Sequence, residues 1–426
     1  MADTFTTMQD VTDEALIEFH NNLGIVKSAN KQYEPKFLDG HWDKGATLDV
    51  RKPNKHIVSD GAVISSIPDT EERTVPLVLN FRKKVAMDFT TADLTHYARV
   101  QFKERFIDPA ILQLANEVEF VVANELAKKV YNHTGQAGTP PASYSDLTKV
   151  KAFLNKMGIP EDHYFAMQED NYASLISNAN LQNSFLTPLN QGITRKYMAG
   201  ALSAMDIMHS IFPPPQIAGV GDSTATQSNG YVAAGTVQTT VASGATTIAI
   251  TGLGASETGV FLEGDKIYIE GFYSVNPIRP AIQTGEPIQF TVTADIDSDA
   301  SGNAVVPISP IVISDTASSY RNVNAQITAG ANVFLASSNT GVGGTGKVPY
   351  KINVAYHKDA IQFAAPPLVM PKDVNVKAAA RAIDPDTGIS IRIIEKYDVL
   401  NDVSITRLDI LFGVLINAEY AIAYLG

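Results

Sequence analysis

The sequence predicts an α+β protein with a β-rich domain inserted into a mixed host domain. Three observations support this prediction. A long amphipathic pattern that begins at Asp108 indicates a helix. Residues 217–346 are rich in Thr, Ser, Ala, Val and Gly. Five short segments there alternate or are β-branched, which is typical of the strands of a small β-barrel: TVQTTV, TTIAIT, DKIYIE, IQFTVT and VVPISPIVI. Longer apolar segments return after Lys347, so we expect the host domain to resume and close there.

Composition and charge exclude several classes of protein. The 426 residues are 45% hydrophobic and 18% charged, which is typical of a globular chain. A net charge of −12 argues against binding nucleic acid through net charge, because phosphates are neutralised by clustered Lys and Arg. No cysteine is present, which excludes disulfides and cysteine metal sites. The acidic start, MADTFTTMQDVTDEA, does not resemble a secretory signal.

The apolar run 408–425 is the one stretch that invites a membrane interpretation. It is interrupted by Asp409, Asn417 and Glu419, whereas a membrane span needs about 20 residues with few or no charges. We therefore expect a buried strand pair, or a strand and a helix, and no membrane partner.

The N-terminal third predicts a short helix followed by a long β-arm. Thr12 can cap a helix over 13–23, and Gly24 can end it. Residues 36–91 contain two alternating stretches, TLDVRKP and TVPLVLNFRKKVAMDFT, without a helical period between them. This segment carries charges of both signs, and two interpretations stay open: a solvated hairpin, or an arm that lies on a neighbouring subunit.

A mixed α and β region follows over 92–215. Asp108 suits an N-cap and the proline after it suits the first helical position, so we expect a helix of roughly 24 residues, about 36 Å long. A second helix over 144–157 should begin at the capping pair Ser143 and Asp146. HYFAM then predicts a strand and DNYASLISNA a helix.

The stretch GVGGTGKV, 341–348, has the G-x-x-x-x-G-K spacing of a phosphate-binding loop. Such a loop needs a helix after it, whose N-terminus holds the phosphates, and Ser or Thr after the lysine. Here Val348 and Pro349 follow, and an expected strand comes next. We interpret the stretch as a flexible Gly-rich linker and predict no nucleotide cofactor.

The stretch DIDSDASGN resembles the start of a calcium loop, because Asp295, Asp297 and Asp299 alternate. Ala300 stands where the sharp turn needs Gly, and Val306 stands where a bidentate Glu is needed. An acidic turn between strands is the preferred interpretation, and the three aspartates are kept as candidate metal ligands.

No pattern of catalytic residues stands out. The eight histidines are scattered, with no H-E-x-x-H motif, and no G-x-S-x-G elbow occurs. The carboxylates do not single out an acid and base pair. The sequence makes no positive case for an enzyme, and we predict neither catalytic residues nor a cofactor.

Four stretches carry a likeness to a known family. They are LANEVEFVVANELAKKV at 114–130, FLEGDKIYIEG at 261–271 with the following YSVNPIRPAIQTGEPIQFTV, PIVISDTASSYRNVNAQITAGANV at 310–333, and NVAYHKDAIQFAAPPLVMP at 353–371. They resemble the major capsid proteins of tailed bacteriophages with the Hong Kong 97-type fold. More closely, the chain resembles the coat proteins of short-tailed enteric podoviruses, which carry an insertion domain of this size at this place. The likeness spans nearly the whole chain.

The resemblance implies a domain order. It places an N-terminal arm with a short helix at 1–35, an extended β-arm or E-loop at 36–91, a P-domain with the spine helix and the start of the A-domain at 92–215, an inserted β-barrel or I-domain at 217–346, and a return to the A- and P-domains at 347–426.

The resemblance also implies a function. We expect a major capsid protein that self-assembles, as pentamers and hexamers, into the icosahedral head shell of the virion. The shell encloses double-stranded DNA without binding it specifically. Assembly in the host bacterial cytoplasm proceeds through a procapsid with a scaffolding protein and a portal protein, and the shell expands on maturation.

Two sets of residues follow as candidate contact sites. Exposed ion pairs contribute only about 0–1 kcal/mol each, but contacts repeated around a closed shell add up. The candidate inter-subunit contacts are the arm residues Arg51, Lys52, Lys55, Glu71, Glu72, Arg82, Lys83 and Lys84, with the acidic loop 295–303 as a further contact. The candidate scaffold contacts are the apolar face of the first helix: Leu16, Ile17, Phe19 and Leu23.

Two alternative functions stay open. An encapsulin-like compartment shares the fold, although the large insertion argues against it. A surface adhesin or binding module could be built on the Thr-rich β-domain, although the absence of a signal in this sequence and the spine helix argue against it.

Overall fold

The structure is a computed structural model of the chain and contains helices and many strands, which confirms the α+β fold class. It describes residues 8–21, 23–31, 45–56, 72–90, 103–177, 201–202, 205–210, 214–222, 230–280, 282–316, 318–336, 349–371, 378–383 and 389–426. The chain divides into two compact units, which are described separately. Unit 1 comprises Met1–Lys52, Thr74–Val122 and Ile361–Leu415, and unit 2 comprises Pro53–Arg73, Ala123–Ala360 and Ile416–Gly426.

Unit 1 is built on a five-stranded sheet in which β18 has two long partners. The strand order is β15–β18–β17–β16, and β3 also pairs with β18. Both β17 and β3 run antiparallel to β18 over long ladders. The strands are β3 (Phe81–Thr90), β15 (Ile361–Ala364), β16 (Ala378–Ile383), β17 (Ser390–Asp398) and β18 (Val403–Ile416).

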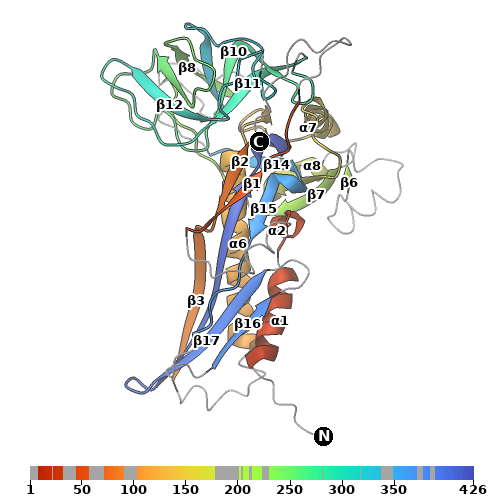
Figure 1. The fold of residues 1–426 in the computed structure, drawn as a ribbon, viewed down its shortest axis with the longest axis vertical. Coiled ribbons are helices and arrows are strands. Elements are labelled where there is room, and N and C mark those ends of the chain that lie inside the picture. Colours follow the sequence, from red (N-terminus) through yellow and green to blue (C-terminus); the bar gives the residue numbers. More distant parts are fainter. Residues whose placement is uncertain are drawn as a thin grey trace. The chain divides into compact units, whose positions relative to one another are not determined.

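Two helices form the N-terminal segment where one was predicted over 13–23. They are α1 (Met8–Asn21), which packs against β16 and β17 (Figure 1), and the single turn α2 (Ile25–Ser28). Gly24, predicted to end a helix, instead occupies the N-cap of α2. At this turn, the backbone N–H groups of Gly24 and Val26 donate to the carboxylate of Glu119, which lies on the long helix described next.

The predicted long helix begins where the sequence places it. It is α6 (Asp108–Lys129), and a short π-helix, η1 (Lys103–Ile107), leads into it. Its apolar side chains recur every three or four residues and are buried, from Ile111 and Leu114 through Val118 to Val122.

The arm contains three described strands rather than the two predicted. β1 (Thr47–Arg51) pairs antiparallel with β2 (Thr74–Val78), and their apolar side chains join a small core with Leu411 and Leu415. The second predicted stretch divides at Leu79, whose backbone pairs with residues 45 and 46 before β3 begins. After this interruption, the chain passes from the sheet of β1 and β2 to the sheet in which β3 pairs with β18.

Unit 2 contains a six-stranded mixed sheet in the order β4–β19–β14–β5–β7–β6. Helices α7 (Tyr144–Lys156) and α8 (Glu169–Ile176) supply much of its apolar core, and the predicted capping box of Ser143 and Asp146 is confirmed. The strands are β4 (His133–Gly135), β5 (His163–Gln168), β6 (Ala201–Leu202), β7 (Met205–Ser210), β14 (Ile352–His357) and β19 (Ala421–Leu425), with short 3-10 turns η2 (Lys358–Ala360) and η3 (Ala418–Tyr420).

The apolar C-terminal run forms two buried strands, β18 and β19, that lie in different sheets and do not pair with each other. None of the described helices is long and apolar enough to span a membrane.

Six strands between Tyr231 and Ala336 close into a barrel in the order β10–β11–β12–β9–β8–β13 (Figure 1). Its interior is filled by alternating aliphatic side chains and by Phe261 and Phe290. The strands are β8 (Tyr231–Val237), β9 (Thr247–Thr251), β10 (Lys266–Val275), β11 (Gln283–Val292), β12 (Asn303–Ser309) and β13 (Asn332–Ala336). β13 was not predicted, and β8 lies earlier than the predicted strand TVQTTV. The Gly-rich stretch 341–348 lies outside the described residues.

Barrel and mixed sheet belong to the same compact unit and share buried hydrogen bonds. The Gln289 side chain accepts from the backbone N–H of His133 and donates to its carbonyl, both at 2.8 Å. The fully buried Lys266 ammonium donates to the carbonyl of Lys128 at 2.8 Å, near the C-terminal end of α6. A cation is favoured at this end of a helix by the unpaired carbonyls. These hydrogen bonds join the barrel to the mixed sheet and to the end of α6. The domain boundaries stay a prediction.

We expect Gln289→Ala to destabilise the unassembled chain by about 2–4 kcal/mol, because two buried backbone groups lose their partners. Urea unfolding measures this change. Gln283→Ala, at the exposed beginning of the same strand, is the control and should change stability by less than about 0.5 kcal/mol. Equal effects of the two substitutions would contradict the role given to Gln289.

Candidate interaction surface

The predicted arm contacts on β1 and β2 divide into paired and unpaired side chains. Arg51 and Glu72 are exposed, and neither forms an ion pair with another described residue. Lys52 is half-buried. Glu71 lies outside the described residues. Among the predicted contacts of this region, Arg51 and Glu72 are therefore the exposed residues without an ion pair to another described residue.

Lys55 has partners within its own chain, which the sequence could not reveal. Its ammonium lies 3.5 Å from the Glu419 carboxylate and 5.5 Å from the centre of the Tyr320 ring. Arg73, which was not predicted, stacks on the same ring at 4.1 Å. Cations over an aromatic face are attracted by its quadrupole. Lys55 is thus less available for another subunit than the sequence suggested.

Strand β3 presents Arg82 and Lys84 on its exposed side. Arg82 pairs with Asp409 at 3.0 Å, and Lys83 pairs with Glu117 of α6 at 2.5 Å. Lys84 forms no ion pair with any residue that the structure describes. Of the three predicted cations on this strand, Lys84 is the one left without a counter-charge.

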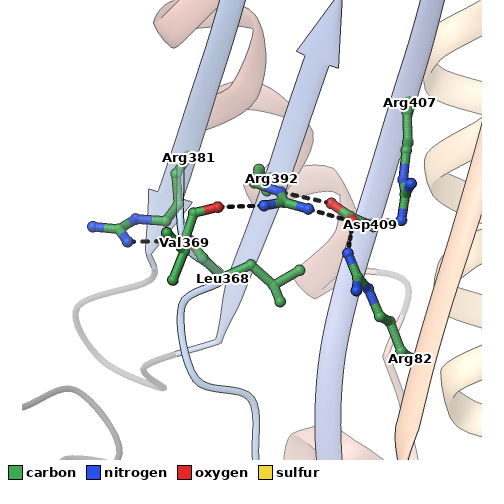
Figure 2. A network of polar contacts seen from close by, with 7 residues as sticks. All are labelled: Arg82, Leu368, Val369, Arg381, Arg392, Arg407 and Asp409. Atoms are coloured by element: carbon green, nitrogen blue, oxygen red, sulfur yellow. Dashed lines mark hydrogen bonds and ion pairs between the residues drawn. The ribbon is translucent and has the colours of Figure 1, made fainter. Parts of the chain in front are cut away.

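Asp409 lies at the centre of an arginine cluster and is fully buried. Arg392 donates to both its oxygens, at 2.9 and 2.6 Å, while Arg82 and Arg407 each donate to Oδ2 at 3.0 Å. Arg392 also donates to the Val369 carbonyl (Figure 2). Figure 2 shows the guanidinium groups of Arg82 and Arg392 pointing at the carboxylate from strands on either side.

The arginines keep the Asp409 carboxylate ionised. Burial acts to raise its pKa, but the hydrogen bonds from Arg392 and Arg82, and the charges of Arg392 and Arg407, outweigh burial and lower the pKa below its ordinary value. A bidentate guanidinium–carboxylate pair of this kind is geometrically specific as well as strong. The cluster therefore ties β3, β17 and β18 together through one charge.

Strand register extends this cluster into a cationic row. Arg381, Arg392, Asp409 and Lys84 are cross-strand partners on four successive strands, so their side chains leave the same face. With Arg82 and Arg407, the group contains five cations and the carboxylate of Asp409. We call these six residues the cationic cluster. Arg82 and Arg407 are 42% and 35% exposed, and Lys84 is exposed too.

The sequence analysis missed most of this cluster. Arg82 and Lys84 were predicted from the charged arm, but Asp409, Arg392 and Arg407 were not. Arg82 and Asp409 are 327 residues apart, and only the pairing of β3 with β18 brings them together. The one signal was an aspartate inside an apolar run, which we used only to exclude a membrane span.

The first helix buries most of the face proposed to contact a scaffold. Leu16, Phe19 and Leu23 are buried within the chain, while Ile17 is 63% exposed. The burial follows from the packing of α1 on β16 and β17. Of the four residues predicted to contact a scaffold, Ile17 is the one whose side chain is exposed in this chain, and the scaffold contact itself stays a prediction.

The three candidate calcium ligands each accept hydrogen bonds from backbone N–H groups. Asp295 accepts from the N–H of Glu263, Asp297 from that of Gly259, and Asp299 from those of two residues in its own turn. Within the described residues no group of three His, Cys, Asp or Glu side chains is placed to hold a metal ion. The aspartates organise turns at the rim of the barrel.

We expect Asp409→Asn to destabilise the unassembled chain by about 3–5 kcal/mol at neutral pH, because Arg392 stays buried without its counter-charge. The lowered pKa of Asp409 gives stability that is present above its ordinary value and is lost as pH falls through the folded value. Urea unfolding at neutral and acid pH should therefore show a difference between the two proteins that shrinks in acid. The control Asp88→Asn, exposed on β3, should leave stability nearly unchanged. A difference that does not shrink in acid would contradict the charge-based account.

Comparisons with known proteins identify the family. The family described as P22 coat protein, gene protein 5, matches residues 1–422. No protein with a curated description matches the chain. Among solved structures, similar chains come from Mycobacterium phage Che8 (10% identity, 94% of this chain and 90% of that chain, TM-score 0.43) and from the capsid of Cyanophage P-SCSP1u (10% identity, 90% and 84%, TM-score 0.41). The capsid of Ralstonia phage GP4 is also similar (8% identity, 90% and 83%, TM-score 0.39).

The family match covers nearly the whole chain. The chain belongs to the P22 coat protein family and is a major capsid protein that forms a phage head shell.

Proposed function

We propose that the cationic cluster is a contact between copies of this chain in the shell. The supporting observation is the charge around Lys84: Arg392, Arg82 and Arg407 share the buried Asp409 carboxylate, and Lys84 stands opposite Asp409 in the strand register without an ion pair to any described residue. Like charges held together repel one another, so an acidic side chain from outside is favoured there. Lys84 forms no ion pair with a described residue, so an acidic side chain of a neighbouring copy would pair with Lys84.

The arm of a neighbouring copy supplies suitable chemistry. Glu72 is exposed, and the sequence places Glu71 beside it. Each such pair contributes only about 0–1 kcal/mol. Weak contacts suit a shell, because misplaced subunits can leave before the particle closes.

The wider assembly scheme is part of the same proposal. The shell forms as pentamers and hexamers around a scaffolding protein, with a portal protein at one vertex, in the host bacterial cytoplasm. It expands on maturation around double-stranded DNA that it does not bind specifically. The protein works as a structural component and not as an enzyme. This scheme is supported by the family and by the negative net charge, which discourages DNA from adhering to the wall.

Charge reversal tests the inter-subunit contact. We expect Lys84→Glu to reduce the yield of closed particles on co-expression with the scaffolding protein, and Lys84→Glu combined with Glu72→Lys to restore part of it. Sedimentation velocity with negative-stain imaging measures the yield. Lys358→Glu, an exposed lysine of unit 2, makes the same change in net charge and should assemble normally. Normal assembly of Lys84→Glu would contradict the contact.

Ile17 remains the proposed scaffold contact on the first helix. We expect Ile17→Asp to lower scaffold-dependent assembly several-fold while leaving the stability of the unassembled chain within about 0.5 kcal/mol, because the side chain is exposed. Co-sedimentation of coat and scaffold measures the effect, with Leu112→Asp, an exposed residue of α6, as the control. Undiminished co-sedimentation of the Ile17 variant would remove this residue from the interface.

A further inference from the structure

A buried carboxylate on α6 has no role in the contacts described so far. Glu119 is 5% exposed and lies on the long helix between the buried Val118 and Val122. Its Oε1 accepts from the backbone N–H of Gly24, and the N–H of Val26 lies 3.3 Å from Oε1 and 3.4 Å from Oε2. The side chain thus reaches across to a segment about 95 residues earlier in the sequence.

These amides belong to the turn between the two N-terminal helices. Gly24 is the N-cap of α2, and no side chain of the cap residue itself accepts from the helix. The first N–H groups of a helix have no partner within it, and here Ile25 and Val26 are buried away from water. The Glu119 carboxylate supplies the acceptor oxygens for the N–H groups of Gly24 and Val26, which no side chain at the N-cap supplies.

The N-terminal segment, residues 8–21 and 23–31, is attached to unit 1 at three places. Before the turn, α1 packs on β16 and β17. After it, Asn30 pairs with the edge of β15, donating to the Ile361 carbonyl at 2.8 Å and accepting from the N–H of Phe363 at 3.1 Å. Between them, residues 24–26 bury Ile25 and Val26, and Glu119 accepts hydrogen bonds from the backbone N–H groups of Gly24 and Val26.

The charge of Glu119 is costly where it stands. Burial raises its pKa to about 7, against the opposing effect of the backbone N–H groups and of Lys31. The acceptor oxygens, and not the negative charge, therefore account for the attachment. A glutamine in this position keeps Oε1 as an acceptor.

We propose that Glu119 is a latch that fixes the turn at residues 24–26 and so holds the N-terminal segment on unit 1. Loss of its acceptor oxygens frees α1 and the turn, while the sheet of β3, β17 and β18 keeps its structure. The latch sets the position of Ile17, because that residue lies on the helix immediately before the turn.

Hydrogen exchange of the unassembled full-length chain, read by mass spectrometry, tests the latch. In Glu119→Ala we expect peptides from residues 8–31 to exchange roughly tenfold faster or more, because the buried N–H groups of Gly24 and Val26 lose their acceptor. Peptides from β17 and β18 should exchange at the wild-type rate. Glu119→Gln should restore wild-type exchange in residues 8–31.

Two further variants complete the design. Glu125→Ala, which removes the pairing of Glu125 with Lys129 on the same helix, is the matched control and should change nothing in residues 8–31. Glu119→Asp keeps the carboxylate, but its shorter side chain moves the oxygens away from residues 24–26. If the alanine variant fails to fold, the aspartate variant should show the same faster exchange, confined to residues 8–31.

Unchanged exchange of residues 8–31 in both the alanine and aspartate variants would overturn the latch. So would equal acceleration throughout unit 1, which would make Glu119 an ordinary core residue, or a glutamine variant as mobile as the alanine variant. The measurement uses the free chain, so its outcome is independent of whether the cationic cluster contacts a neighbour.

Discussion

One buried carboxylate organises the sheet of unit 1. Asp409 is surrounded by arginines from β3, β17 and β18, and it stays ionised because their hydrogen bonds and charges outweigh the effect of burial. Breaking such an arrangement is costly, since an uncompensated guanidinium would remain buried. The same arrangement gathers more cations than one carboxylate neutralises, so the feature that holds the sheet also creates the charge that a neighbouring copy can satisfy.

Elsewhere, side chains satisfy the backbone of segments far away in the sequence. Gln289 pairs with both backbone groups of His133, Lys266 with a carbonyl near the end of α6, and Glu119 with the turn after α1. Each contact joins elements that the chain order separates by 95 residues or more.

The elements that depend on local periodicity could be predicted, and the contacts that depend on the fold could not. The helix from Asp108, the capping pair of α7 and most barrel strands followed from spacing and caps. A first helix was predicted, but it begins at Met8, so Thr12 lies within it and is not its N-cap. Its apolar face was proposed as a partner surface, because the sequence does not show that β16 and β17 pack against the helix. Arg82 and Lys83 were predicted from the charged arm as inter-subunit contacts, and the structure shows that each forms an ion pair within its own chain. Their partners could not be read from the sequence, because Asp409 is brought near by the pairing of β3 with β18 and Glu117 lies on helix α6.

The most direct test of the cationic cluster is a zero-length carbodiimide coupling of assembled shells made from an equal mixture of unlabelled and nitrogen-15-labelled subunits. Mass spectrometry then shows whether each coupled lysine and carboxylate come from one copy or from two. The account predicts mixed-isotope products that join Lys84 to an acidic residue of another copy. Lys84 left uncoupled, or coupled only within its own copy, would contradict it.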